Sequence, residues 1–423
     1  MDLQRRLRLI PTDLNEYFER ILFTVDNFYR KETAQMFQVT LKSRDVMSLM
    51  TYWYMDQEDS FLKNLAVRPI SNSVIDERLG QMCKRLNACC KGLLEVYSVN
   101  SGQGQDAFFY LKVDFLHRTV RDFLRDPDMQ NMLGKWVGVD FDANIAICQA
   151  LIAQVKTAPQ EPVFFHLGGP MNRIVHLFFS HSHVLDDSQY PLKLETRLLD
   201  DLTAALVWHR SKVGDIRNLL SSFDSDNPGS FSMDPTYLVL REAVQNGFHR
   251  YVSRKLDERS NLPQEEQADL LCCALFPSQS RPVSAPRPPM VKLLLEKGCG
   301  CYGLNGSINN FRESAMGDNT PWTLFLESEY EIMRTGTSLE DILPIIKDML
   351  SHGADINAEC FLGAIMGGTR KAAEVVRMLI LDIDARALGD LLTRRTDVQQ
   401  EKPESSRRKR FISMVFKGRK IKR

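Results

Sequence analysis

Long apolar runs and an excess of one charge are both missing from this 423-residue chain. No stretch of 18 apolar residues occurs, so we expect no transmembrane helix. Lys and Arg together number 54, as do Asp and Glu, and a net charge of zero argues against bulk attraction to nucleic acid or membranes. Hydrophobic residues nevertheless make up 43% of the chain, which is enough to build cores and excludes wholesale disorder.

The nine cysteines form neither a disulfide framework nor a zinc motif that we can recognise. Their number is odd, the chain is far longer than a disulfide-stabilised miniprotein, and no Cys-x-x-Cys pair occurs. Reduced thiols in an intracellular protein fit this pattern best. The N-terminus, MDLQRRLRLIP, carries charges where a signal peptide needs an apolar segment. We therefore expect a cytoplasmic protein.

Catalytic and cofactor-binding signatures are missing as well. A P-loop needs Gly-x4-Gly-Lys-Ser/Thr, but after the pair Gly134-Lys135 the position of the hydroxyl is taken by Trp136. Residues 298–303 fit Gly-x-Gly-x-x-Gly, yet they follow a helix-like segment, which favours an inter-helix turn over a dinucleotide site. The His/Asp cluster at residues 181–187 ends an apolar helix, where polar residues are expected without a metal. We therefore predict no enzyme activity, no cofactor and no metal.

The first 130 residues combine helical patterns with one β-hairpin. Apolar residues recur at helical spacing after a start signal at Pro11-Thr12-Asp13, and the period changes to that of a strand after Cys90. In chain order the pattern predicts helices over residues 14–25, 31–41 and 76–90, strands over 91–99 and 108–115 joined by a turn, and a helix over 116–124. Helices followed by a β-hairpin predict a winged-helix-like module.

Three blocks in this region are distinctive: LIPTDLNEYFERILFTVDNFYRKETAQMFQVTL, RLNACCKGLLEV and VDFLHRTVRDFL, in that order. Together they resemble the segment that follows the NACHT nucleotide-binding domain in fungal NLR-like proteins. The resemblance covers residues 7–126 well and extends loosely to about residue 220. It implies a regulatory role in non-self recognition or cell-death signalling, with a NACHT-bearing chain among the partners.

Motifs of a second kind lie in the C-terminal half: MVKLLLEKG, NTPWT and IKDMLSHGADINA. They resemble the closing helix, the Thr-Pro opening and the Gly-Ala-Asp-Ile-Asn turn of ankyrin repeats. Gly298 and Gly353 are 55 residues apart, which exceeds one repeat of about 33 residues, so we expect an insertion around residues 328–339. Residues 237–256 and 361–381 are interpreted as flanking helix pairs. The pattern predicts an irregular ankyrin-like array.

Mixed charges surround the third block of the first resemblance. Arg118, Arg121 and Arg125 would form a basic stripe on a winged-helix face, but acidic residues interleave with them, namely Asp114, Asp122, Asp126 and Asp128. A mixed, solvated face is therefore favoured, and nucleic-acid binding is not expected. His117 is interpreted as a packing or capping residue at the start of a helix.

The largest charge asymmetry lies at the C-terminus. Residues 400–423 include ten basic and two acidic residues, whereas the remaining 399 residues hold 44 basic and 52 acidic ones. Two basic clusters flank an apolar segment and predict a nuclear-import signal or contact with an anionic partner; a solvated, disordered end is the alternative. The clusters comprise Arg407, Arg408, Lys409, Arg410, Lys417, Arg419, Lys420, Lys422 and Arg423.

Taken together, the patterns predict a mainly α-helical, non-enzymatic regulatory protein that binds other proteins. The expected domains are a winged-helix-like module over residues 1–130, a helical region over 131–225, a degenerate ankyrin-like repeat region over 226–390 and a disordered basic tail over 391–423. Stacked repeats offer an extended surface for a protein partner. Two alternatives stay open: the separated half of a NACHT nucleoside triphosphatase, and a winged-helix nucleic-acid binder with a basic tail.

Overall fold

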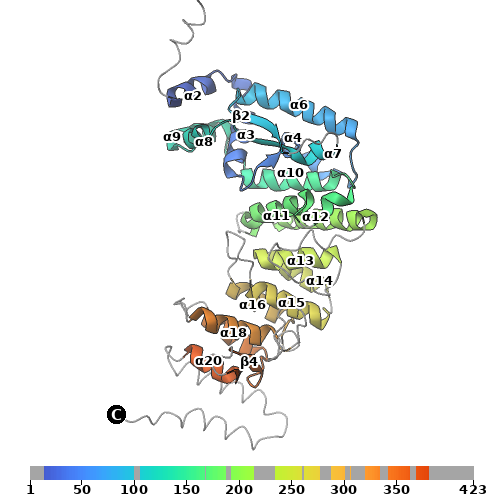
Figure 1. Ribbon diagram of the computed structural model, residues 1–423, viewed down its shortest axis with the longest axis vertical. Helices are drawn as coiled ribbons and strands as arrows, with labels where there is room; N and C mark the ends of the chain where they lie inside the picture. Colours follow the sequence, from blue (N-terminus) through green and yellow to red (C-terminus); the bar gives the residue numbers. More distant parts are fainter. Residues whose placement is uncertain are drawn as a thin grey trace, which may run out of the picture. The chain divides into compact units, whose positions relative to one another are not determined.

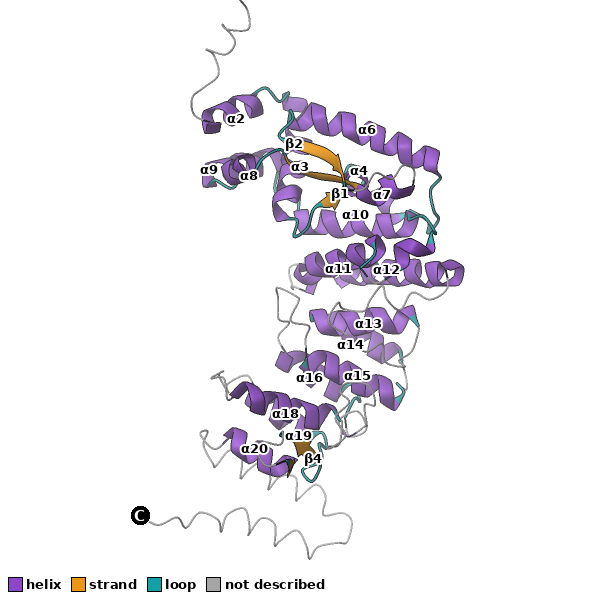
Figure 2. Cartoon of the chain, viewed as in Figure 1, coloured by secondary structure: helices purple, strands orange, loops and turns teal. Residues whose placement is uncertain are grey.

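The chain is mainly helical and carries a small antiparallel sheet, which confirms the predicted fold class (Figures 1 and 2). A computed structural model describes residues 14–99, 105–166, 168–186, 192–213, 234–259, 262–276, 287–300, 305, 320–333, 342–362 and 368–380. Two compact units are present: Met1–Ser225 with Met233–Tyr251, and Asp226–Ser232 with Val252–Arg423. Within the described ranges, no helix is both long and apolar enough to cross a membrane.

Three helices of the first unit lie where the apolar period predicts helices. Helices α2 (Leu14–Phe23), α3 (Arg30–Lys42) and α6 (Asn72–Cys90) confirm the three expected near the N-terminus. The others are η1 (Asn27–Tyr29), α4 (Leu49–Met55), α5 (Asp59–Lys63), α7 (Gln105–Tyr110), α8 (Arg118–Leu124), α9 (Pro127–Val137), α10 (Ala143–Thr157), η2 (Pro162–Phe165), α11 (Pro170–Ser182), η3 (His183–Asp186), α12 (Leu192–Val213) and α13 (Pro235–Asn246).

Helix α10 is the centre of the first unit. Its N-cap, Asp142, accepts hydrogen bonds from the backbone amides of Asn144 and Ile145 at 2.7 and 3.2 Å, which satisfies two of the free donors at the helix start. Most of its side chains are buried because α3, α4, α11 and α12 pack around it (Figure 2). The packing of α10 against α3 and α4 joins segments on either side of residue 130.

The sheet of the first unit has three strands, in the order β1-β3-β2, and all neighbours are antiparallel. Strands β2 (Leu94–Ser98) and β3 (Leu111–Phe115) form the predicted hairpin, with Val96 opposite Val113. Strand β1 (Met47–Ser48) adds two residues on the other side of β3. The sequence did not predict β1, since two residues are too few to display the alternation that identifies a strand.

The expectation of a strand over residues 108–115 is wrong at its start, where Phe108 and Phe109 belong to helix α7. Consecutive residues of a strand point to opposite faces, but both phenylalanines are buried, at 0% and 2% exposure. A helical turn directs both rings inward, so that Phe108 and Phe109 contact each other and Phe109 contacts Phe164, each pair with centroids 4.8 Å apart. The strand begins only at Leu111.

The second unit consists of helices that pack in successive pairs. Helix α15 (Gln264–Leu275) packs against α16 (Arg287–Glu296) and α18 (Pro321–Met333), and α16 packs against α19 (Ile342–Ser351). A short antiparallel pair, β4 (Glu359–Phe361) with β5 (Thr369–Lys371), precedes α20 (Ala372–Ile380), which packs against α18. Helix α14 (His249–Glu258) lies across the boundary of the two units in the sequence.

Two helices of the second unit end in the same glycine-dependent turn. Gly298 and Gly353 have φ values of 102° and 104°, a region that L side chains rarely adopt. After each glycine, the next residue donates its backbone N–H back across the last helical turn, from Cys299 to Leu294 and from Ala354 to Met349, both at 3.0 Å. This is the Schellman ending, with a buried residue after the glycine. It confirms the two predicted glycine turns.

Two expectations for the second unit need correction. The described residues of 361–381 do not form a helix pair, because they begin at the end of strand β4 and contain β5 directly before helix α20. The alternation of exposed Glu359 with buried Cys360 suits a strand. The insertion expected around residues 328–339 does not begin there either, since α18 continues to Met333. Glu329 and Tyr330 are buried in that helix, and residues 334–339 lie outside the described ranges.

Candidate functional site

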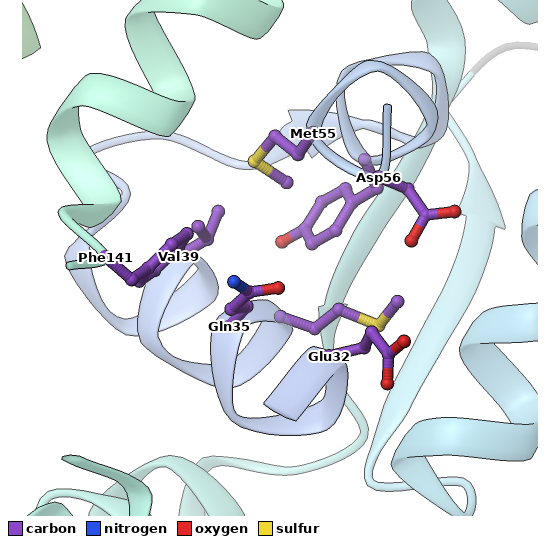
Figure 3. Close-up of a pocket in the computed structure, with 8 residues that line it drawn as sticks. Glu32, Gln35, Val39, Met55, Asp56 and Phe141 are labelled. Carbon is purple, nitrogen blue, oxygen red and sulfur yellow. The ribbon is translucent and has the colours of Figure 1, made fainter. Parts of the chain in front are cut away.

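A small pocket opens on the first unit where α3 faces α4. Helix α3 contributes Glu32, Gln35, Met36 and Val39; α4 and its C-cap contribute Tyr52, Met55 and Asp56; and Phe141 precedes α10. The two carboxylates lie toward one side of the pocket, Val39 and Phe141 lie at the opposite side, and the Gln35 amide lies between them (Figure 3). The pocket therefore has one acidic end and one apolar end.

The acidic end is built by residues of three helices. Arg85 of α6 directs one guanidinium nitrogen, Nη2, to Glu32 Oε1 at 3.3 Å and to Asp56 Oδ1 at 3.0 Å. The side chains of Glu32 and Asp56 are 26% and 17% exposed, so both charges are partly removed from water. Two carboxylates thus share one cation. The second oxygen of Glu32, Oε2, is buried and has no hydrogen-bond partner among the described residues.

The environment makes Asp56 unusually easy to protonate. Burial raises the pKa of its carboxyl to about 6; Arg85 lowers that pKa and Glu32 raises it further. Asp56 is also the C-cap of α4, and the negative end of the helix dipole disfavours a carboxylate there. Ionised Asp56 is therefore a net cost to the fold near neutral pH. Perturbed carboxyls in clefts are found more often at functional sites than elsewhere.

We expect the substitution Asp56→Asn to stabilise the first unit at pH 7 by about 1–2 kcal/mol. The folded-state pKa of Asp56 is raised, so the folded protein holds more protons than the unfolded chain between about pH 4 and about pH 6. Stability from this group is therefore lost as pH rises through that window. Asparagine removes the charge and keeps an oxygen for Arg85. Hydrogen exchange of the α3 and α4 amides at pH 4.5 and 7 measures the effect.

The matched control for this prediction is Asp122→Asn. Asp122 lies in the same unit and pairs with Arg118 at 3.4 Å, but its side chain is 56% exposed. A surface pair of this kind contributes little, so the control is expected to change stability by less than about 0.5 kcal/mol. A loss of protection in Asp56→Asn at pH 7, or an unchanged pH dependence, would contradict the assignment of a destabilising charge.

Burial also shifts the pKa of two further groups at and beside the pocket. Burial raises the pKa of the Tyr52 hydroxyl, which donates to or accepts from Thr40 Oγ1 at 2.8 Å. Burial also raises the pKa of the nearby Cys89 thiol, so a reactive thiolate is disfavoured. Among the described residues, no three His, Cys, Asp or Glu side chains are placed to share a metal ion. What the pocket offers is negative charge beside apolar walls.

The residues whose sequence patterns resemble known sites lie outside this pocket. Gly134 and Lys135 are inside helix α9, which is not the loop that a P-loop requires. Gly298 ends helix α16, so the Gly-x-Gly segment follows a helix, as expected. The nine basic residues of the tail, from Arg407 to Arg423, lie outside the described ranges.

Two of the histidines, His117 and His181, take part in contacts that stabilise the fold. His117 caps α8 by accepting the backbone N–H of Thr119 at 3.2 Å, which confirms its predicted role at the helix start. His181 is 1% exposed and contacts Asn144 Oδ1 at 3.0 Å, and burial lowers its pKa to about 4. Two of the arginines that follow His117 are paired with acids: Arg118 with Asp122 at 3.4 Å and Arg121 with Asp114 at 2.7 Å. These contacts agree with a mixed face.

Sequence reasoning did not find the pocket. Glu32, Asp56 and Arg85 are separated by more than twenty residues each and belong to three different helices, so no short motif unites them. One signal was present: Asp56 directly follows the apolar run of α4, Leu49–Met55. A carboxylate at the end of such a helix is disfavoured by the dipole, and this placement alone marks the position as unusual.

The fold and the pocket define a mainly α-helical protein whose first unit carries a small three-stranded sheet. Residues 24–162 match the family model of a domain of unknown function (DUF7791). The matched segment includes the three strands of the first sheet and all the residues that line the pocket. No curated protein and no solved structure matches the chain.

Proposed function

We propose that this chain is a non-enzymatic regulatory module that acts by binding other proteins. The observation that carries the proposal is the stacking of helices in the second unit, where α15 packs on α18 and α16 packs on α19. Pairs of helices that stack on their neighbours leave an extended outer surface, and such surfaces serve protein recognition. A module of this kind needs no catalytic group.

The details of the helix ends support an ankyrin-like assignment for this array. Thr320 and Thr323 bond reciprocally at the start of α18: each backbone N–H donates to the other's hydroxyl, at 3.1 and 3.2 Å. The indole of Trp322 then donates to the backbone oxygen of Asp355 at 3.0 Å. This hydrogen bond connects the Thr-Pro opening to the Gly-Ala-Asp-Ile-Asn turn. These are two of the motifs that carry the sequence resemblance.

The regulatory part of the proposal rests on the resemblance of residues 7–126 to the segment that follows a NACHT domain. If residues 7–126 act like the segment after a NACHT domain, the chain works with a nucleotide-switched partner, in non-self recognition or cell-death signalling. A winged-helix-like role for the first unit, with helices around a β2–β3 hairpin, is part of the same proposal. A cytoplasmic location goes with it, and the basic tail adds nuclear import as a second expectation.

The proposal is tested by recovering the tagged full chain from its own cells and identifying what remains bound in stoichiometric amount. We expect one protein partner, and we expect purified chain to hydrolyse neither ATP nor GTP above the buffer rate. The double substitution Lys292→Glu/Glu296→Lys reverses the exposed pair of α16 while keeping its i,i+4 geometry, and it is expected to weaken the complex.

The control for this experiment is the same exchange in the first unit, Glu16→Arg/Arg20→Glu. These two residues also form an exposed i,i+4 pair, on helix α2, with a 2.6 Å contact. The control should leave the amount of bound partner unchanged. Nucleotide hydrolysis by the purified chain, or a chain recovered without any stoichiometric protein, would contradict the proposed function.

A further inference from the structure

The pocket of the first unit is short of one positive charge. Glu32 and Asp56 carry two negative charges at its acidic end, and Arg85 supplies one positive charge to both through a single nitrogen. Glu32 Oε2 is left buried without a hydrogen-bond partner in the described part of the chain. A buried carboxylate oxygen is stabilised strongly when a cationic donor reaches it. The acidic end therefore suits a second cation.

The other walls of the pocket indicate which kind of cation would fit. Met36, Val39, Met55 and Phe141 line the same pocket and provide thioether, aliphatic and aromatic surface. Val39 and Phe141 lie on the side opposite the acids (Figure 3). Such walls favour an apolar stem that ends in a charged head, and Arg and Lys side chains have this form. A hydrated metal ion would leave the apolar walls unused.

We propose that this pocket binds an arginine side chain presented by another protein. A planar guanidinium donates two parallel hydrogen bonds to a carboxylate and stacks on aromatic rings, whereas an ammonium is a compact and strongly hydrated charge. Here the guanidinium donates to the carboxylates of Glu32 and Asp56, whose side chains are 26% and 17% exposed, and the aliphatic stem lies toward Phe141. The proposal goes beyond the proposed function because it assigns a ligand chemistry to the first unit.

The methionines at the pocket provide a direct probe. The full-length protein is labelled with 13C at the methionine methyl groups and titrated with N-acetyl-arginine amide. We expect saturable shifts of the Met36 and Met55 signals and no shift of Met171, which is 0% exposed on α11. N-acetyl-citrulline amide, a neutral ligand of nearly the same shape, is expected to bind at least tenfold more weakly, and N-acetyl-lysine amide to fall between the two.

Two double variants distinguish binding at the pocket from a general effect of the protein's negative charge. Glu32→Gln/Asp56→Asn should weaken the arginine ligand at least tenfold, while Glu16→Gln/Asp122→Asn, which removes two charges from exposed positions, should leave binding unchanged. If the double variant does not fold, the single variant Glu32→Gln is tested instead, because the Glu32 side chain is more exposed than that of Asp56.

Three results would overturn the inference: no saturable shift at Met36 and Met55, equal affinity for the citrulline ligand, or unchanged affinity in the Glu32 variant. Lysine binding as tightly as arginine would overturn the guanidinium assignment. None of these readouts involves the second unit, so the helix-array proposal and its α16 exchange are judged independently.

Discussion

Replacing Trp322 with alanine is expected to lower the free energy of unfolding of the second unit by about 3–5 kcal/mol. Trp322 is 0% exposed and is among the largest fully buried side chains of the described residues. Its removal leaves a cavity at the start of α18 and also removes the indole donor to the Asp355 oxygen. Both losses act on the contact between the Thr-Pro opening and the Gly-Ala-Asp-Ile-Asn turn.

A more conservative variant separates the two contributions. Trp322→Phe keeps most of the buried apolar surface but lacks the N–H group, and it is expected to cost about 1–2 kcal/mol. Hydrogen exchange of α18, α19 and α20 reports the local effect without assuming that the whole chain unfolds in one step. Trp136→Ala, at a partly exposed position of α9 in the first unit, is the control. Unchanged hydrogen exchange in the Trp322→Ala variant would contradict the expectation that Trp322 stabilises the contact between α18 and the turn at Asp355.

The second large effect is expected at Gln154, in the centre of the first unit. Gln154 is 1% exposed; its Nε2 group donates to Ser48 Oγ at 2.8 Å and to the Phe108 backbone oxygen at 3.2 Å, and its Oε1 accepts from Thr51 Oγ1 at 2.8 Å. Replacement by leucine keeps the approximate volume and leaves buried polar partners unsatisfied. We expect a loss of about 2–4 kcal/mol.

The readout for Gln154→Leu is urea unfolding together with hydrogen exchange of α4 and α7. Helix α4 carries Tyr52 and Met55, so loosening of this helix should also broaden the Met55 methyl signal at the pocket. Gln149→Leu is the matched control on the same helix, because its bond to Asp59 Oδ1 lies at an exposed position. Equal stability losses in the two variants would show that the buried network contributes nothing specific.

Local patterns were enough to place many of the elements. The apolar period predicted α2, α3 and α6, and the change of period after Cys90 predicted the β2–β3 hairpin. The glycines at 298 and 353 marked helix ends, because few residues other than glycine adopt the positive φ that the Schellman ending requires. These predictions depend on residues within one or two turns of each other.

The local sequence patterns gave wrong predictions where contacts with residues far away in the sequence determine the backbone conformation. Phe108 and Phe109 read as part of a strand, yet they are helical because Phe109 packs on Phe164. Strand β1 exists because β3 offers it a free edge, which its two residues do not reveal. Residues 361–381 were expected to be helices, but β4 and β5 pair with each other there, while Glu327 of α18 accepts the backbone N–H of Phe361 at 2.6 Å.

The helical class of the protein, its hairpin and its glycine turns follow from local sequence alone, since helix periodicity and backbone steric limits depend on neighbouring residues. The pocket, in contrast, depends on how the helices pack in three dimensions. Glu32, Asp56 and Arg85 meet because α3, α4 and α6 bury their apolar faces together, and the charges between them follow from that packing. Burial then sets the protonation of Asp56, because the cost of a charge depends on what surrounds it after folding.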